Sequence, residues 1–219
     1  MKDDKGRVLI PGFYSDIFLS DTIKGILEGV PSEEASIKAR TQTKLNDLVG
    51  STYQESLQYP SLNIRGMQSG WVGKEARTII PSSATAEMDI RLVSESQPKI
   101  LISGVKEHIE GLGFTVLDHT PRSDERLQYD KIIQMKAKVH YPAFRTDSKA
   151  KEGEWIIKIL NDYYQKSPVI IRTSGGSVPI SPFVSQLGVP AIGVPTVNLD
   201  NNQHSPNAVS YTHLRAHET

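Results

Sequence analysis

The sequence predicts an α/β protein in two parts: an α+β part built from an antiparallel sheet plus helices, and a C-terminal βαβ part of a mixed sheet. For the first part, apolar and polar residues alternate strictly over residues 85–92 of a predicted strand at 85–93, which is typical of a half-buried antiparallel strand. For the second, residues 169–172 and 189–195 are short apolar runs, and residues 182–187 between them suit one or two helical turns. Two strands joined by a helical crossover lie parallel.

Composition and charge exclude several classes of protein. The formal net charge of the 219 residues is zero and 23% of them are charged, which gives no electrostatic case for nucleic acid or a membrane surface. Cysteine is absent, which excludes disulfides and thiolate metal sites. The longest apolar runs, about four or five residues, are too short to span a membrane. We expect neither a nucleic-acid nor a membrane partner, and the compartment stays open between cytoplasmic and exported.

The N-terminal region predicts an exposed helical excursion before the sheet. Residues 21–29 and 32–43 have helical patterns, and the second region is rich in Glu, Lys and Gln. Ser32 is the expected N-cap, with Glu33 and Glu34 in the first turn, where carboxylates interact favourably with the helix dipole. No chemistry is assigned to this region.

A strand–strand–helix–strand order follows, which favours a small α+β domain. Residues 61–67 predict the first strand, 98–112 a helix that ends before Gly113, and 114–117 a further strand. Four apolar residues at helical spacing predict the buried stripe of the helix: Leu101, Val105, Ile109 and Leu112.

The polar residues 119–129 predict a hinge between the two parts of the chain. The acid pairs Glu33–Glu34 and Asp124–Glu125 are expected to be solvated, because paired acids act as acid and base only when they share burial. A helical stripe over residues 155–163 then leads into the βαβ unit.

The predicted βαβ unit places two polar loops at one sheet edge. Parallel strands direct the loop of Gly175, Gly176 and Ser177 and the loop around His204 to the carboxyl ends of the strands, where open α/β sheets bind ligands. The first loop offers backbone N–H groups and a hydroxyl; the second offers an imidazole among Asp and Asn residues. On residue pattern alone, His204 is equally compatible with capping a turn, and Arg91 with being a solvated charge on a strand face.

Six segments, spread in order over residues 1–207, resemble the carnosinase/aminoacylase (peptidase M20) metallopeptidase family, in particular its bacterial dipeptidase-like members. They are LIPGFY at 9–14, PSLNIRG at 60–66, KEARTIIP at 74–81, MDIRLV at 88–93, RTSGGSVP at 172–179 and QHSPN at 203–207. The resemblance implies that residues 1–125 are the later part of a lid and dimerisation domain, and that 126–208 are the C-terminal part of a zinc-hydrolase catalytic domain.

The resemblance also implies roles for particular residues. His204 would be a terminal zinc ligand, and Ser177 with the Gly175 and Gly176 amides would hold the substrate carboxylate or carbonyl. Thr78 and Arg91 would reach the substrate from the lid, across a homodimer. The substrate would be a peptide or an N-acyl amino acid, and Zn²⁺ the cofactor, two per subunit. Ser174 stands where better-known carnosinases carry an acid, which leaves the choice of substrate open.

The remaining zinc ligands and the glutamate general base of the family lie upstream of anything in this sequence. We therefore expect an inactive fragment without catalytic residues of its own, in which Met1 is an internal methionine. Residues 209–219 resemble a translated adapter from DNA library preparation, so His213 and His217 are given no role.

Three functions stay open at this stage. The first is a zinc-dependent hydrolase of peptide or amide bonds, of dipeptidase or aminoacylase type, to which this chain contributes. The second is a non-catalytic dimerisation or binding fragment. The third is a hydrolase that uses Ser177 and His204, which the absence of a Gly-x-Ser-x-Gly elbow disfavours.

Overall fold

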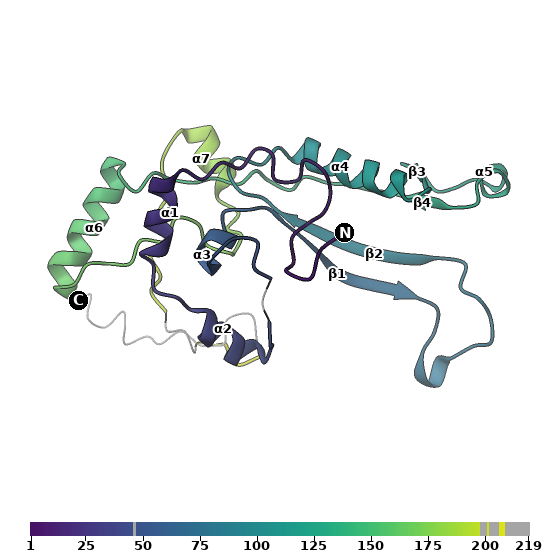
Figure 1. Cartoon of the computed structure of the whole chain (residues 1–219), viewed down its shortest axis with the longest axis horizontal. Helices are drawn as coiled ribbons and strands as arrows, with labels where there is room; N and C mark the ends of the chain where they lie inside the picture. Colours follow the sequence, from purple (N-terminus) through teal and green to yellow (C-terminus); the bar gives the residue numbers. More distant parts are fainter. Residues whose placement is uncertain (46, 198–200, 202–205, 209–219) are drawn as a thin grey trace.

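A computed structural model describes the chain apart from residues 46, 198–200, 202–205 and 209–219 (Figure 1). A long hairpin and the helix α4 extend from one end, and the helices α6 and α7 lie toward the other. In chain order the elements are α1 (Asp21–Glu28), α2 (Glu34–Thr41), α3 (Tyr53–Ser56), β1 (Ser61–Ser69), η1 (Gly73–Glu75), β2 (Ala84–Arg91), α4 (Pro98–Gly111), β3 (Thr115–Leu117), α5 (Ser123–Gln128), β4 (Ile132–Gln134), α6 (Lys151–Tyr164) and α7 (Ser181–Leu187).

The strands β1 and β2 form a hairpin, which confirms the antiparallel strand predicted from the alternation of apolar and polar residues. The strands are antiparallel, with Leu62 opposite Ile90 and Asn63 opposite Asp89, and a bulge interrupts the register at Arg65. Directly opposite residues lie on one face, so the apolar side chains of both strands share one side and the polar ones the other. Met88, Ile90 and Leu92 pack against the main core from the apolar side.

The main core joins the hairpin, the helix α4 and the N-terminal segment. Leu101, Val105 and Ile109 of α4 are buried, as the helical spacing predicts. Leu112 is an exception, since 56% of it is exposed. The helix ends at Gly111, and Leu112 has non-helical dihedrals that turn its side chain out of the stripe. The remaining buried members of this core are Val8, Ile10, Phe13 and Leu62.

Residues 119–129 are more ordered than the predicted hinge. They contain the helix α5 and lead into β4, which pairs in parallel with β3 and was not predicted. Glu125 is buried, with 8% exposed, so the expectation that the Asp124–Glu125 pair is solvated is wrong for Glu125. Its carboxylate has hydrogen-bond donors around it that compensate for the lost water.

Ser32 is one residue removed from the N-cap position predicted for it. The cap of α2 is Glu33, whose side chain makes no capping hydrogen bond. The Ser32 Oγ instead accepts a long bond of 3.5 Å from the Glu34 N–H. The helix has no buried residue, as expected for an exposed excursion.

The two apolar runs around α7 are not strands in this structure, although α7 itself forms as predicted. Val169, Ile170 and Ile171 are between 42% and 57% exposed. A strand requires a hydrogen-bonded neighbour, and no segment of the described chain lies beside residues 169–172 or 189–195 as one. The described residues therefore do not form the predicted βαβ unit. The mixed α/β class is confirmed, with one antiparallel and one parallel pair of strands.

Within the described ranges, no helix has both the length and the apolar character required to cross a bilayer. The longest, α4 and α6, have 14 residues each.

Candidate functional site

Arg91 and Ser177, 86 residues apart, meet in the structure. The Arg91 Nη1 donates a hydrogen bond to the Ser177 Oγ at 2.5 Å. Arg91 is the last residue of β2, and its Nε lies 2.8 Å from the Asp89 Oδ2 on the same strand face. These two partners fix the planar guanidinium in one orientation, while 55% of the side chain stays exposed to a ligand.

The loop that carries Ser177 approaches α3 closely. A Cβ on Gly175 would lie 3.2 Å from the Leu57 Cδ2 and 3.8 Å from the Tyr53 hydroxyl, so a larger residue would require the Leu57 side chain or the loop to shift. In the described part of the chain, the backbone N–H groups of Gly175 and Gly176 donate no hydrogen bond. The loop thus presents free donors beside a fixed guanidinium, an arrangement that suits a carboxylate.

Within one chain, the structure does not place Thr78 near Arg91 and Ser177. It lies exposed in the loop between η1 and β2, at the end of the hairpin opposite to Arg91 (Figure 1). β2 alone separates these ends by about 23 Å at the usual rise of a strand. Thr78 and Arg91 can therefore contact one small substrate only if they come from two different chains.

The predicted metal ligand His204 lies outside the described residues. Among the residues that the structure does place, no group of three His, Asp or Glu side chains gathers as a metal site. A catalytic zinc ion takes three protein ligands and a water. These residues alone therefore do not fit a complete zinc site, and they supply no catalytic step through the metal.

A polar hub that was not predicted from the sequence lies next to the Ser177 loop. We define it as Gln58, Glu95, Arg145 and Arg172. Arg145 binds both carboxylate oxygens of Glu95, with Nη1 3.1 Å from Oε2. Arg172 donates to the Gln58 Oε1 at 2.5 Å and lies 3.8 Å from Glu95. The hub joins residues that are 50 and 114 positions apart, so no local sequence pattern predicts it.

The hub favours Glu95 as a carboxylate. Burial alone would raise the pKa of Glu95, but hydrogen bonds from Arg145 and Ser94 outweigh burial and lower the pKa to about 2. Burial and the neighbouring charge of Arg145 lower the pKa of Arg172, and the Glu95 carboxylate partly restores it. Glu95 therefore neutralises part of the charge of two partly buried guanidinium groups.

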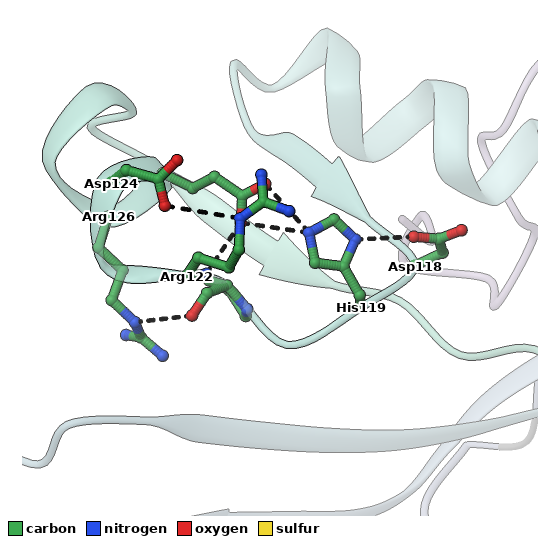
Figure 2. Close-up of polar contacts among 7 residues, drawn as sticks. Asp118, His119, Arg122, Asp124 and Arg126 are labelled. Atoms are coloured by element: carbon green, nitrogen blue, oxygen red, sulfur yellow. Dashed lines mark hydrogen bonds and ion pairs between the residues drawn. The ribbon is translucent and has the colours of Figure 1, made fainter.

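A second polar cluster surrounds His119 at the far end of the molecule, beside α5 (Figure 2). The His119 Nδ1 lies 2.9 Å from Asp118, and its Nε2 lies 3.0 Å from Glu125. The Arg122 backbone N–H donates a hydrogen bond of 2.8 Å to the Glu125 side chain. Glu125 is the N3 residue of α5, so this bond is the one that defines a capping box. These contacts attach the start of α5 to the segment after β3, and they lie away from Arg91 and Ser177.

The hydrogen bonds of this cluster shift the pKa values of its members. The bond to Asp118, followed by the bond to Glu125, raises the pKa of His119. The Arg122 N–H is the largest influence on Glu125 and lowers its pKa, against an opposing effect of burial. The cluster therefore favours a charged imidazolium between two carboxylates.

A cavity of about 340 Å³ lies between α1, α2 and α3. Its lining includes three carboxylate side chains, those of Glu28, Glu33 and Glu34. None of the site residues predicted from the sequence lines it.

Comparison with known proteins places this geometry in a family context. Residues 26–114 match the family described as "Peptidase dimerisation domain". The Cys-Gly metallodipeptidase DUG1 of Candida albicans is 26% identical over 209 residues, which cover 94% of this chain and 41% of that protein. The Beta-Ala-His dipeptidase of Rattus norvegicus is 26% identical over 113 residues, covering 50% of this chain and 23% of that protein. The chain thus spans about two fifths or less of the length of these relatives.

Solved structures agree. An M20 family metallo-carboxypeptidase from Sulfolobus solfataricus aligns with a TM-score of 0.70 and 25% identity over 94% of this chain and 45% of that one. The dipeptidase Dug1p from Saccharomyces cerevisiae aligns with a TM-score of 0.68 and 22% identity, over 94% of this chain and 42% of that one, which shows a shared fold. The fold and the sequence are thus similar to those of M20 metallopeptidases, and one segment of the chain matches a peptidase dimerisation domain. The chain is similar to M20 metallopeptidases, as the resemblance predicted, and residues 26–114 are the part that matches the dimerisation domain.

Proposed function

We propose that this chain contributes the dimerisation domain and a substrate-carboxylate site to a zinc-dependent hydrolase of peptide or amide bonds, of dipeptidase or aminoacylase type. The contact between Arg91 and Ser177 is the observation that supports this most directly, because it unites a strand of the dimerisation domain with the Gly-Gly-Ser loop. The names of the relatives, Cys-Gly metallodipeptidase and Beta-Ala-His dipeptidase, indicate the substrate class.

The chemistry of this site matches one carboxylate. The Arg91 guanidinium provides a fixed positive charge with donors in a fork, and the Gly175 and Gly176 amides add neutral donors. Ser177 can donate its own hydroxyl proton while it accepts from Arg91. A dipeptide or an N-acyl amino acid has one such free carboxylate next to its scissile bond.

The reading of Ser177 as a nucleophile has less support. Its hydroxyl accepts a hydrogen bond from Arg91, and a guanidinium has no lone pair with which to take a proton. An activated serine requires an adjacent general base. A binding role for Ser177 is therefore part of the proposal, and a hydrolase based on Ser177 and His204 is not.

Zinc and the homodimer complete the proposal. His204 is the one zinc ligand that we assign to this chain, and the catalytic base and other ligands are assigned to the remainder of a longer protein. Thr78, at the far end of the hairpin, is proposed to contact the substrate held by the second subunit. The chain aligns with only part of the length of its relatives, which is consistent with the base and the other ligands lying elsewhere in a longer protein.

A second candidate, a non-catalytic dimerisation fragment, is favoured by exposed apolar side chains on the hairpin. Met67 and Ile80 are 76% and 94% exposed. Exposed apolar side chains that gather on one element are typical of a protein–protein contact.

The carboxylate site is tested by assaying the zinc-loaded full-length enzyme on dipeptide acids and on the matching dipeptide amides. The Arg91→Ala variant is expected to lose roughly 10- to 100-fold in kcat/KM for acids, the range of one charge-assisted pair, and little for amides. Arg65→Ala, which removes the exposed pair with Glu87 on the same hairpin, is the control. Equal losses for both substrates, or activity that survives removal of zinc by a chelator, would contradict the proposal.

A further inference from the structure

Gln58 lies at the centre of the polar hub, and both the oxygen and the nitrogen of its side-chain amide are hydrogen-bonded. Only 1% of Gln58 is exposed. Its Oε1 accepts from the Arg172 Nη1 at 2.5 Å and from the Thr173 Oγ1 at 3.2 Å, while its Nε2 donates to the Gln54 carbonyl at 3.1 Å. Because its oxygen accepts and its nitrogen donates, this buried amide has one orientation, so Gln58 fixes residues 172–173 to the end of α3.

Residues 172–177 are thereby held at three successive points. Gln58 and Glu95 hold Arg172, the Leu57 side chain limits the approach of Gly175, and Arg91 holds Ser177. The first and third points both depend on β2 and the turn after it, since Arg91 ends the strand and Glu95 follows four residues later.

The turn that carries Glu95 is itself fixed. The Val93 N–H donates to the Ser96 Oγ at 3.1 Å, and the Ser96 N–H donates to the Val93 carbonyl at 2.9 Å. Glu95 therefore projects from a closed turn, at a defined distance from Arg91 along the same backbone. Arg145 holds the Glu95 carboxylate from the opposite part of the chain.

We propose that Glu95, Gln58 and Arg145 are positioning residues that hold the loop of Gly175, Gly176 and Ser177 against Arg91, and thereby set the preference for substrates with a free carboxylate. The substrate part of this inference rests on the proposed function, and the positioning part rests on the contacts alone. Loss of the Glu95 charge would leave two guanidinium groups, with side chains 24% and 19% exposed, facing each other without a counter-ion. Their repulsion displaces Arg172 and releases the loop.

The positioning part is tested on this chain by ¹⁵N relaxation of the Gly175 and Gly176 amides. In the unaltered chain we expect order parameters near about 0.85, the value of rigid backbone, and in Glu95→Gln a fall below about 0.6. Amides of α4 should not change. Glu87→Gln is the matched control, because it removes a carboxylate from an ion pair in which both side chains are 62% exposed.

A second variant keeps the test informative if Glu95→Gln does not fold. Arg145→Lys retains the positive charge but loses the two-pronged contact with Glu95, and it should loosen the same two glycines to a smaller extent. Glycine amides that stay rigid in both folded variants, or that are already mobile in the unaltered chain, would overturn the inference.

The substrate part has a kinetic readout in the full-length enzyme. Glu95→Gln should raise KM for dipeptide acids about tenfold, which is one decade of affinity, and should change kcat and the rates for dipeptide amides little. If Glu95→Gln loosens the loop but Arg91→Ala leaves the preference for acids intact, the carboxylate site of the proposed function fails and the positioning role stands. If Arg91→Ala abolishes the preference while the loop stays rigid in Glu95→Gln, the proposed function stands and the positioning role fails.

Discussion

Arg91 forms an ion pair and a hydrogen bond with partners that come from different parts of the chain. Asp89 lies two residues before it on the same strand face, and Ser177 belongs to a distant loop. An arginine can serve both because its Nε and Nη atoms form a rigid fork, whereas a lysine has a single ammonium group. The side chain therefore links strand and loop and still exposes donors to a ligand.

At the same scale, the His119 cluster predicts a pH optimum for the helix α5. The pKa of His119 is raised, so its stabilising contribution is complete below the ordinary value of 6.5 and is lost as pH rises through the raised pKa. The pKa of Glu125 is lowered, so its contribution is complete above 4.5 and is lost as pH falls through the lowered pKa. Protection of α5 amides against hydrogen exchange should be greatest between these two pH values.

The His119→Gln variant isolates one side of this optimum. It removes the imidazolium next to Asp118 and Glu125, so protection of the Arg126 and Tyr129 amides should no longer decline above pH 6.5 for this reason. Decline on the acidic side should persist, because Glu125 still accepts from the Arg122 N–H. Native protein with equal protection at pH 6 and at higher pH would contradict the prediction, and His108→Gln on α4 is the control.

Contacts between residues that are far apart along the chain could not be predicted from local sequence patterns. The resemblance identified Arg91 and Ser177, and the structure brings them together. Nothing local distinguishes Glu95 or Gln58 from solvated surface residues, because their partners lie 50 and 114 positions away. Glu125 was misjudged for a similar reason, since an adjacent acid pair has the same pattern whether or not a histidine folds over it.

At the scale of elements, periodic patterns predicted helices and strands well wherever the chain also supplies the packing partner. The hairpin and α4 form because each buries its apolar side against the other and against residues 8–13. The runs 169–172 and 189–195 have comparable strand propensity, yet they remain exposed without a neighbouring strand in the described chain. Propensity describes how well a residue suits a sheet, and pairing decides whether the sheet exists.

The helix α4 allows a matched test of burial. Leu101→Ala removes a side chain that is 5% exposed in the main core and should lower the free energy of unfolding by about 2–5 kcal/mol. The same change at Leu112, which is 56% exposed, should cost less than about 0.5 kcal/mol. Urea denaturation followed by circular dichroism measures both, and similar losses for the two variants would show that Leu112 packs in the core after all.

At the scale of the whole molecule, the apolar face of the hairpin is only partly covered. Near α4, Leu62 and Ile90 are opposite each other and contact the core. Further along the same strands, Ile64 is 58% exposed and Met67, opposite Ala86, is 76% exposed. One continuous face therefore changes from buried to open as the hairpin extends away from the core (Figure 1).

This open end of the face, within the segment that matches a peptidase dimerisation domain, predicts that the chain self-associates through the hairpin. Analytical ultracentrifugation should give one species with twice the chain mass of 24.3 kDa. Met67→Lys places a charge on the exposed apolar face and should shift the equilibrium toward monomer, because burial of an unpaired ammonium is costly. Thr85→Lys, on the opposite face of the same hairpin, should leave the dimer intact. A mass that rises without limit with concentration would indicate aggregation through the open face, and equal dissociation of both variants would place the interface elsewhere.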